Sequence, residues 1–192
     1  MGQTSEAPTD AARERILATA YELFSHRGIR DVGIGEVIEN ASIAKATLYR
    51  HFPSKDDLVV AFLDLRGHRW TEETLEAEAR RRASSAEGRL LAIFDVLDEW
   101  FRGDDYECCS FVNVLLEMRP DHPAGREAKH QLERVRSVIR TFAEEAGLRE
   151  PDRFAVACQL LVNGSIVCAA AGNSDAARPA QELARALIEL HR

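Results

Sequence analysis

Four side chains that follow one another closely in the sequence have the chemistry needed to bind a nucleic acid. Lys45 and Arg50 are cations, and the hydroxyl groups of Thr47 and Tyr49 can donate and accept hydrogen bonds. On a helix, residues four apart share a face, so Lys45 and Tyr49 lie together, with Arg50 beside them. The surrounding segment 40–55 contains no Asp or Glu that would repel phosphate. We therefore expect these side chains to contact the backbone and the base edges of DNA.

The net charge of −7 argues against nucleic-acid binding only if the charge is spread evenly along the chain. Acidic and basic side chains balance within residues 1–55, and the whole excess of Asp and Glu lies in residues 56–192. The chain thus has a locally basic segment attached to an acidic remainder. This division predicts an N-terminal DNA-binding domain over 1–55 and a C-terminal body over 56–192.

Two short helices with a three-residue connection are predicted to position the four side chains. The apolar pattern predicts one helix over about 34–40 and a second over about 44–51, which ends before Pro53. The side chains expected to face inward from this pair are Val37, Ile38, Ile43, Leu48 and Phe52. This pattern is typical of a helix-turn-helix, whose second helix lies in the major groove of DNA.

The run Thr47-Leu48-Tyr49-Arg50-His51-Phe52-Pro53-Ser54-Lys55 makes the prediction more specific. Ahead of it, apolar residues at helical spacing predict a helix over 10–26 that Gly28 ends. Together these residues resemble the signature of the tetracycline-repressor (TetR) family of transcriptional regulators. The resemblance implies a homodimer that binds a palindromic double-stranded DNA operator, and a repressor that a small-molecule effector releases.

The resemblance also implies roles for individual residues. It assigns DNA contacts to Lys45, Ala46, Thr47, Tyr49, Arg50, His51 and Lys55. Arg50 carries the forked guanidinium that pairs with guanine, Lys55 is expected at a phosphate, and His51 suits packing at the helix end equally well. Four positions depart from the usual family pattern and are expected to alter base contacts more than the fold. They are Gly33 in place of a Ser or Thr cap, Ile38 in place of Ala, Ser42 in place of Gly, and Ala44 in place of Ser.

Beyond residue 55 the sequence predicts only helices, which makes the fold class all-α with about nine helices. Ser54 with Asp57 is expected to cap the next helix, and Ser84 with Glu87 a later one. The helices expected after the DNA-binding segment are 55 to about 82, 87–102, 110–118, 123–146, 151–172 and 179–191.

A ligand pocket is predicted in this helical body, where aromatic and polar side chains are mixed. The residues proposed to line it are Phe94, Trp100, Phe101, Phe111, Asn113, Glu117, Phe142 and Asn163. A few polar groups on an apolar lining are typical of small-molecule sites, and the TetR resemblance implies such a site. The alternative is that the aromatic residues are ordinary core and the polar groups bond to nearby backbone.

The segment 154–173 contains no charged residue, which raises the alternative of a membrane-spanning helix. Its polar residues and glycines favour a helix buried in protein, partly by a second subunit, over membrane insertion. We expect the homodimer interface to include Gly164, Ser165, Cys168, Leu183, Leu187 and Leu190.

Other chemistry has little support in the sequence. The four cysteines have no metal-ligand or disulfide spacing, although a redox role for Cys108 or Cys109 stays open. No phosphate-binding glycine loop or nucleophile–base motif occurs, so we expect neither an enzyme nor a cofactor. The polar segment 1–10 predicts no signal peptide and, with reduced thiols, a cytoplasmic protein. The alternative function is a helical ligand-binding module that does not bind DNA.

Overall fold

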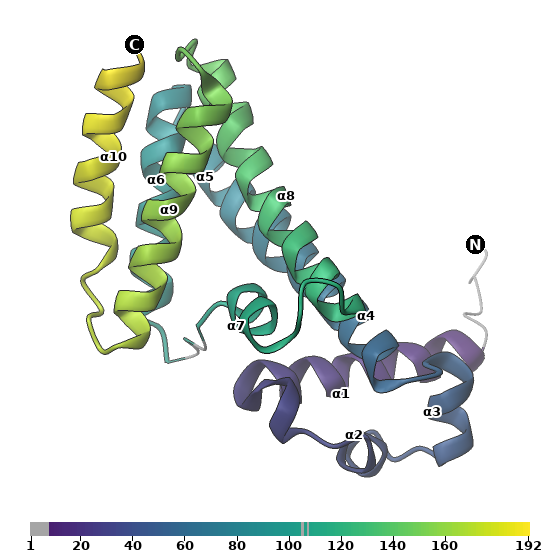
Figure 1. Ribbon diagram of the computed structural model, residues 1–192. Coiled ribbons are helices and arrows are strands. Elements are labelled where there is room, and N and C mark those ends of the chain that lie inside the picture. The colour runs from purple at the N-terminus through teal and green to yellow at the C-terminus, as the bar shows by residue number, and fades with distance from the viewer. Residues whose placement is uncertain (1–7, 105, 107) are drawn as a thin grey trace, which may run out of the picture. The chain divides into compact units, whose positions relative to one another are not determined.

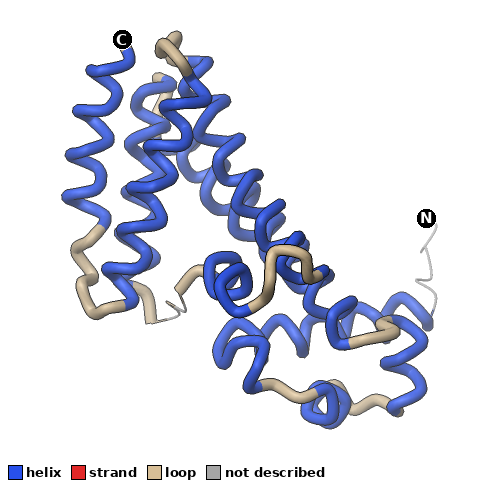
Figure 2. Tube along the Cα trace, viewed as in Figure 1, coloured by secondary structure: helices blue, strands red, loops and turns tan. Residues whose placement is uncertain are grey.

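A computed structural model describes residues 8–104, 106 and 108–192, so the prediction for segment 1–10 lies largely outside the described residues. Every regular element in the described part of the chain is helical (Figure 2). Three consecutive elements follow one another without a break and count as one continuous helix. The described residues therefore contain nine continuous helices. The all-α prediction and the helix number are therefore confirmed.

The first three helices, α1 (Pro8–Asp31), α2 (Ile34–Asn40) and α3 (Lys45–His51), match the predicted helix-turn-helix (Figure 1). Within α1 the helical geometry is interrupted at Gly28, which has φ 77° and ψ 166°. This backbone region is open to glycine and costly for other residues. The interruption turns the chain so that Ile29 and Val32 become buried.

The continuous helix that follows α3 begins with the predicted cap. The backbone N–H of Asp57 donates to Ser54 Oγ at 3.1 Å, and the Ser54 hydroxyl donates to the Asp57 carboxylate at 2.6 Å. This continuous helix consists of α4 (Lys55–Gly67), η1 (His68–Glu76) and α5 (Ala77–Arg82). The middle stretch η1 is π-helical, a geometry that is rare and widens the helix.

The helices form two compact units that differ from the predicted division at residue 55. One unit contains the described residues up to Arg66 together with Ser110–Lys129, and the other contains the described parts of Gly67–Cys109 and His130–Arg192. The first unit therefore includes α4 and α7 (Ser110–Glu117) besides the helix-turn-helix. Here Arg30 donates a hydrogen bond of 2.9 Å to the backbone oxygen of Glu117. Contacts of this kind join residues far apart in the sequence, so local patterns do not predict them.

The second unit is a bundle of long helices around an apolar core. It contains η1, α5, α6 (Ala86–Arg102), most of α8 (Pro123–Glu145), α9 (Pro151–Ala170) and α10 (Ala177–His191). Its largest fully buried side chains include Phe94 of α6, Phe142 of α8 and Phe154 of α9. Helix α10 packs beside α6 and α9 (Figure 1).

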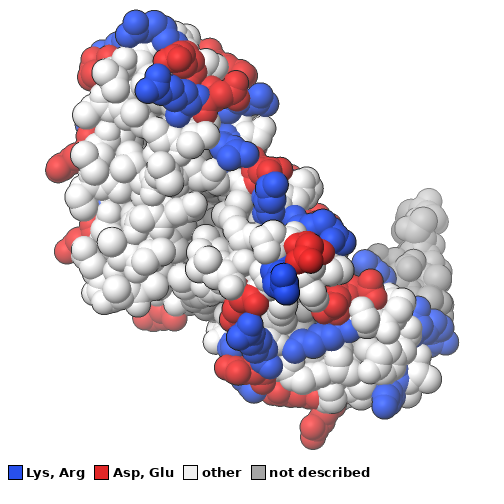
Figure 3. All heavy atoms as spheres, viewed as in Figure 1, with Lys and Arg blue, Asp and Glu red and all other residues white. Residues whose placement is uncertain are grey.

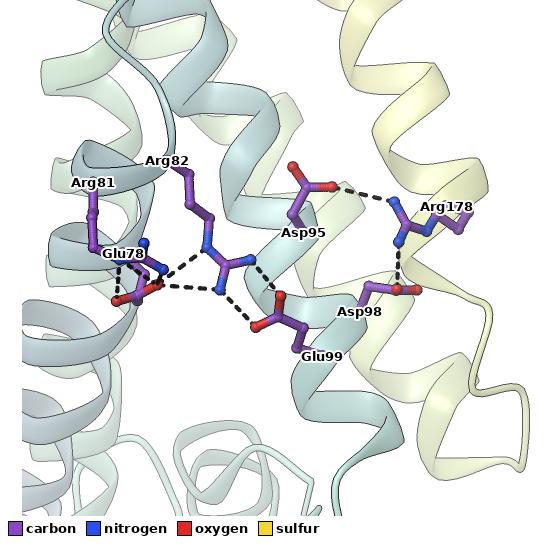
Figure 4. A network of polar contacts seen from close by, with 7 residues as sticks. All are labelled: Glu78, Arg81, Arg82, Asp95, Asp98, Glu99 and Arg178. Carbon is purple, nitrogen blue, oxygen red and sulfur yellow. Dashed lines mark hydrogen bonds and ion pairs between the residues drawn. The ribbon is translucent and has the colours of Figure 1, made fainter.

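A polar network holds α5 and α10 against α6 (Figure 4). The guanidinium of Arg178 in α10 bonds to Asp98 at 2.6 Å and to Asp95 at 3.2 Å. Asp98 is only 4% exposed, so this charged pair is worth more than one at the surface. On α5, hydrogen bonds from Arg81 lower the pKa of Glu78 from 4.5 to about 2. The bonds from the half-exposed Arg178 to the buried Asp98 help to fix which face α10 turns to solvent.

The cap of α6 corrects a prediction. The N-cap is Ser85 rather than Ser84, because the backbone N–H of Gly88 donates to Ser85 Oγ at 3.1 Å. Consequently the reciprocal Ser84–Glu87 box does not form, and Glu87 instead accepts hydrogen bonds from Arg192. The sequence offered two adjacent serines, and the helix begins one residue before the predicted start.

This pair of serines gives a matched test of the cap. We expect Ser85→Ala to lower the free energy of unfolding by about 1 kcal/mol, since an N-terminal amide loses its acceptor. Ser84→Ala is the control and should change it by less than about 0.5 kcal/mol. Urea denaturation followed by circular dichroism measures both, and equal effects of the two changes would place the cap elsewhere.

Candidate nucleic-acid interface

Helix α3 is held in place by one buried row of side chains. Leu48 is fully buried and Phe52 is 3% exposed, and both pack with Val37 of α2 in the interior of the first unit. Ile38 and Ile43, expected to be inward, are only partly buried. The predicted core of the helix pair is thus formed by three of its five members, and the two isoleucines lie at its margin.

The opposite face of α3 is open to solvent. Lys45, Ala46, Tyr49 and Arg50 are exposed, and Tyr49 has 40% of its surface free. The Lys45 ammonium lies 5.9 Å from the centre of the Tyr49 ring, and Arg50 Nη2 donates a long hydrogen bond of 3.4 Å to the Thr47 hydroxyl. These contacts keep both cations and both hydroxyls on one surface. The predicted grouping of these side chains is therefore present in the fold.

The turn between α2 and α3 depends on a left-handed residue. Ser42 has φ 50°, a conformation that glycine adopts more easily than serine. The backbone N–H of Ile43 donates to Ile38 O at 3.2 Å and closes the turn. This explains why a glycine is usual there in the family pattern, and it shows that the serine in this chain keeps the turn geometry at some cost.

The two remaining predicted contacts have internal roles. His51 Nε2 is buried and has no hydrogen-bond partner among the described residues. The Lys55 ammonium donates to the backbone oxygen of Ile29 and lies 6.0 Å from the Phe24 ring centre. Because an ammonium has three protons, this bond leaves Lys55 able to bind a phosphate as well. The structure thus gives Lys55 a part in holding α4 to α1.

Two arginines near this surface were not among the predicted site residues. The Arg13 guanidinium lies 5.3 Å from the centre of the Phe52 ring, which places a cation beside the end of α3. Arg27 forms an ion pair with Glu36 in the first turn of α2 and bonds to Asp31 O at 3.1 Å. Both residues lie off the apolar face of α1, so the sequence marked them only as solvent-facing.

The predicted pocket residues do not gather within one unit. Phe111, Asn113 and Glu117 belong to the first unit, whereas Phe94, Trp100, Phe101, Phe142 and Asn163 belong to the second. Four of the phenylalanines, at positions 94, 101, 111 and 142, are buried, and Asn113 is exposed. Half of the predicted set therefore consists of core residues.

An aromatic cluster in the second unit joins two of the predicted pocket residues, Trp100 and Phe101, with two residues that were not predicted. Trp100 lies 4.3 Å from Trp70 and 4.8 Å from Tyr106 between ring centres, and Phe101 lies 5.3 Å from Tyr106. The Tyr106 hydroxyl donates to Ile166 O at 2.7 Å, and burial raises the pKa of Tyr106. Trp70 and Tyr106 were missed because they come from the π-helical stretch and a loop, far from Trp100 in sequence.

Helix α9, which has no charged residue from Phe154 onward, exposes much of its apolar surface. Leu160 is 68% exposed, Val167 is 56% exposed, and Leu183 and Leu190 of α10 are 58% and 71% exposed. Figure 3 shows this part of the second unit as a broad surface without charged side chains. By length and composition alone, α9 is the one helix in the described part of the chain that could cross a membrane.

The predicted interface residues divide between this surface and the interior. Gly164, Cys168, Leu183 and Leu190 are exposed, and Leu187 is half-buried. Ser165 is a correction, because it is only 5% exposed and its hydroxyl donates to Val162 O at 2.8 Å inside the chain. A serine can bond its hydroxyl to its own helix and lie inside the chain, so its small size alone does not mark it as an interface residue.

Comparison with known proteins agrees with these features. Residues 16–62 match the model of the bacterial regulatory proteins of the tetR family. The chain is 39% identical over 56 residues to the transcriptional activator FasR of Mycolicibacterium smegmatis, covering 29% of this chain and 26% of FasR. It is 29% identical over 80 residues to the regulator AcrR of Shigella flexneri, covering 42% and 37%. The matched segment thus spans well under half the length of these curated relatives.

A solved structure matches nearly the whole chain. The TetR-family regulator SCO4454 of Streptomyces coelicolor has a TM-score of 0.84 and 25% sequence identity, over 95% of this chain and 96% of that one. The fold and the exposed face of α3 define a helix-turn-helix protein of the DNA-binding class. More specifically, residues 16–62 match the tetR family of bacterial regulatory proteins, and the fold of the whole chain resembles that of a TetR-family regulator.

Proposed function

We propose that this protein is a transcriptional regulator, most simply a repressor, that binds a palindromic operator as a homodimer in the cytoplasm. The observation that carries the proposal is the solvent-facing group of Lys45, Tyr49 and Arg50 on a helix anchored by buried Leu48. The forked guanidinium of Arg50 and the hydroxyl of Tyr49, carried on a short rigid helix, can reach base edges and phosphates. Its relatives are regulators rather than enzymes, which supports a non-catalytic function.

The exposed apolar surface of α9 and α10 supports the homodimer. An apolar surface of this kind on a water-soluble protein is normally covered by a partner. A second copy of the chain offers the same surface, and a two-fold axis would bring both into contact. The same axis would place two α3 helices for the two halves of a palindrome.

A small-molecule effector is proposed to weaken operator binding. The aromatic cluster of Trp70, Trp100, Phe101 and Tyr106 supplies contact surface of the type that small apolar ligands use. A coupling free energy of about 1–3 kcal/mol between effector binding and operator binding is sufficient for this regulation.

DNA binding can be tested with the intergenic DNA that flanks the gene. We expect wild-type protein to retard this DNA and its affinity to fall steeply with salt, since lysines and arginines displace counterions. Arg50→Ala should weaken binding about 5- to 150-fold, which is the value of one bidentate base contact. Fluorescence anisotropy at several salt concentrations measures both.

Arg153→Ala is a suitable control, because Arg153 is an exposed arginine of α9 that pairs with the neighbouring Glu150. It should leave DNA affinity unchanged within about twofold. If Lys45→Ala and Arg50→Ala bind as well as Arg153→Ala, the exposed face of α3 does not contact the DNA. If the wild-type protein does not bind this DNA at all, the alternative of a ligand-binding module without DNA function holds.

The cysteines report on the dimer. Cys158 is buried, which raises the pKa of its thiol to about 12, so it should resist alkylation at pH 8. Cys168 is exposed in the single chain and lies on the proposed interface. We therefore expect Cys168 to be alkylated slowly in the wild-type protein and at least tenfold faster in Leu160→Glu, which places a charge in the interface. Mass spectrometry of labelled peptides measures the rates.

Size-exclusion chromatography of the same two proteins provides the control. Wild-type protein should elute as a dimer and Leu160→Glu as a folded monomer. Rapid labelling of Cys168 in a wild-type dimer would show that the subunits meet through another surface.

A further inference from the structure

A charged hollow in the second unit has no part in the sites described above. Its volume is about 380 Å³, which lies within the range of small-molecule sites, and it lies between α8 and the first turns of α9. The residues that line it are Glu133, Arg136, Ser137 and Arg140 of α8 and Asp152 and Val156 of α9. Positions four apart share a face of a helix, so the two arginines stand side by side on one wall, and Asp152 and Val156 stand side by side on the other.

The two arginines of the hollow form only long ion pairs with other described residues. Arg136 lies 4.0 Å from a carboxylate oxygen of Glu133. Arg140 lies 3.7 Å from one of Asp152 and 3.9 Å from one of Glu144. A hydrogen bond between such groups is about 2.7–3.2 Å long, and the arginines in Figure 4 reach 2.6 Å. The side chains of Arg136 and Arg140 are 41% and 44% exposed, so a small molecule can reach their N–H donors.

The facing wall supplies the opposite charge and an apolar contact. The side chain of Asp152 is 85% exposed and accepts no hydrogen bond from another described residue. Val156 is 48% exposed, and the Ser137 hydroxyl lies on the α8 wall beside the arginines. A simple anion in this volume would be repelled by Asp152, and a simple cation by Arg136 and Arg140. A molecule that carries both charges satisfies both walls.

We propose that this hollow binds a free α-amino acid with an aliphatic side chain. The α-carboxylate accepts hydrogen bonds from Arg136 and Arg140, and the α-ammonium donates to Asp152. A guanidinium and a carboxylate are both planar and can form two parallel hydrogen bonds, which makes the arginines the anchor of the ligand. The aliphatic side chain covers Val156 and removes part of its apolar surface from water.

This binding does not rest on the functions proposed above. Every group that carries it belongs to the second unit, and none belongs to the aromatic cluster. The hollow adjoins the N-terminal end of α9, whereas the predicted interface residues Gly164 and Cys168 lie nearer the C-terminal end of that helix. Failure of DNA binding and failure of amino-acid binding can therefore be told apart.

Calorimetric titration of the full-length protein with L-alanine, L-valine and L-leucine, without DNA, tests the proposal. We expect at least one of them to bind with a millimolar or lower dissociation constant. The N-acetyl derivative of the amino acid that binds most tightly lacks the ammonium group, and its amide lacks the carboxylate. Each derivative should bind at least tenfold more weakly, because it loses one of the two charged contacts.

Two substitutions assign the contacts to the walls of the hollow. Arg140→Gln and Asp152→Asn should each weaken binding of the amino acid about tenfold, which corresponds to the loss of a hydrogen bond to a charged group. Arg153→Gln is the matched control, since Arg153 is the neighbour of Asp152 and does not line the hollow. It should bind the amino acid as wild type does.

The comparison of the derivatives uses only wild-type protein, so it stands even if a variant is destabilised. No binding of any of the three amino acids would overturn the proposal. Equally tight binding of the N-acetyl derivative would also overturn it, since the site would then recognise an anion alone. Unchanged binding by both Arg140→Gln and Asp152→Asn would show that an amino acid binds elsewhere on the protein.

Discussion

The burial of Leu48 and Phe52 is the constraint on which the rest of this molecule depends. A helix of seven residues is too short to be stable alone in water, so α3 exists because its apolar side is fixed against α1 and α2. That burial also decides which side chains face outward. Lys45, Tyr49 and Arg50 are exposed because Leu48 is not. A change in the packing of Leu48 and Phe52 would therefore redirect all three of these side chains together.

A second constraint acts on the helical body. Helix α9 has no charged residue from Phe154 onward, yet only 39% of its apolar window is buried within the chain. The hydrophobic effect penalises that exposure at about 25 cal/mol per Å² of apolar surface. Pairing of α9 and α10 with a second copy removes the penalty. The proposed dimer would thus account for the same feature that resembles a membrane helix.

The sequence predicted the helices well because their ends are marked by local chemistry. Pro123, Pro151 and Gly147 begin or end helices close to the predicted residues. The π-helical stretch, the bond from Lys55 to Ile29 and the aromatic partners of Trp100 were not predictable in this way. Each depends on residues distant in sequence, and a hydrophobic pattern gives only the face of a side chain, not its neighbour. The predicted pocket residues are divided between the two units, and the pocket stays a prediction.

Affinity cleavage is the most direct test of the central claim that two α3 helices enter one duplex. Ala46→Cys, in a variant whose other exposed cysteines are replaced, would carry an iron chelate that cleaves nearby DNA. We predict two cleavage sites in the operator, which lie about one helical turn apart (~34 Å) or a multiple of it. The symmetry of the palindrome should relate the two sites. Cleavage at a single site, or none in a complex that still forms, would contradict it.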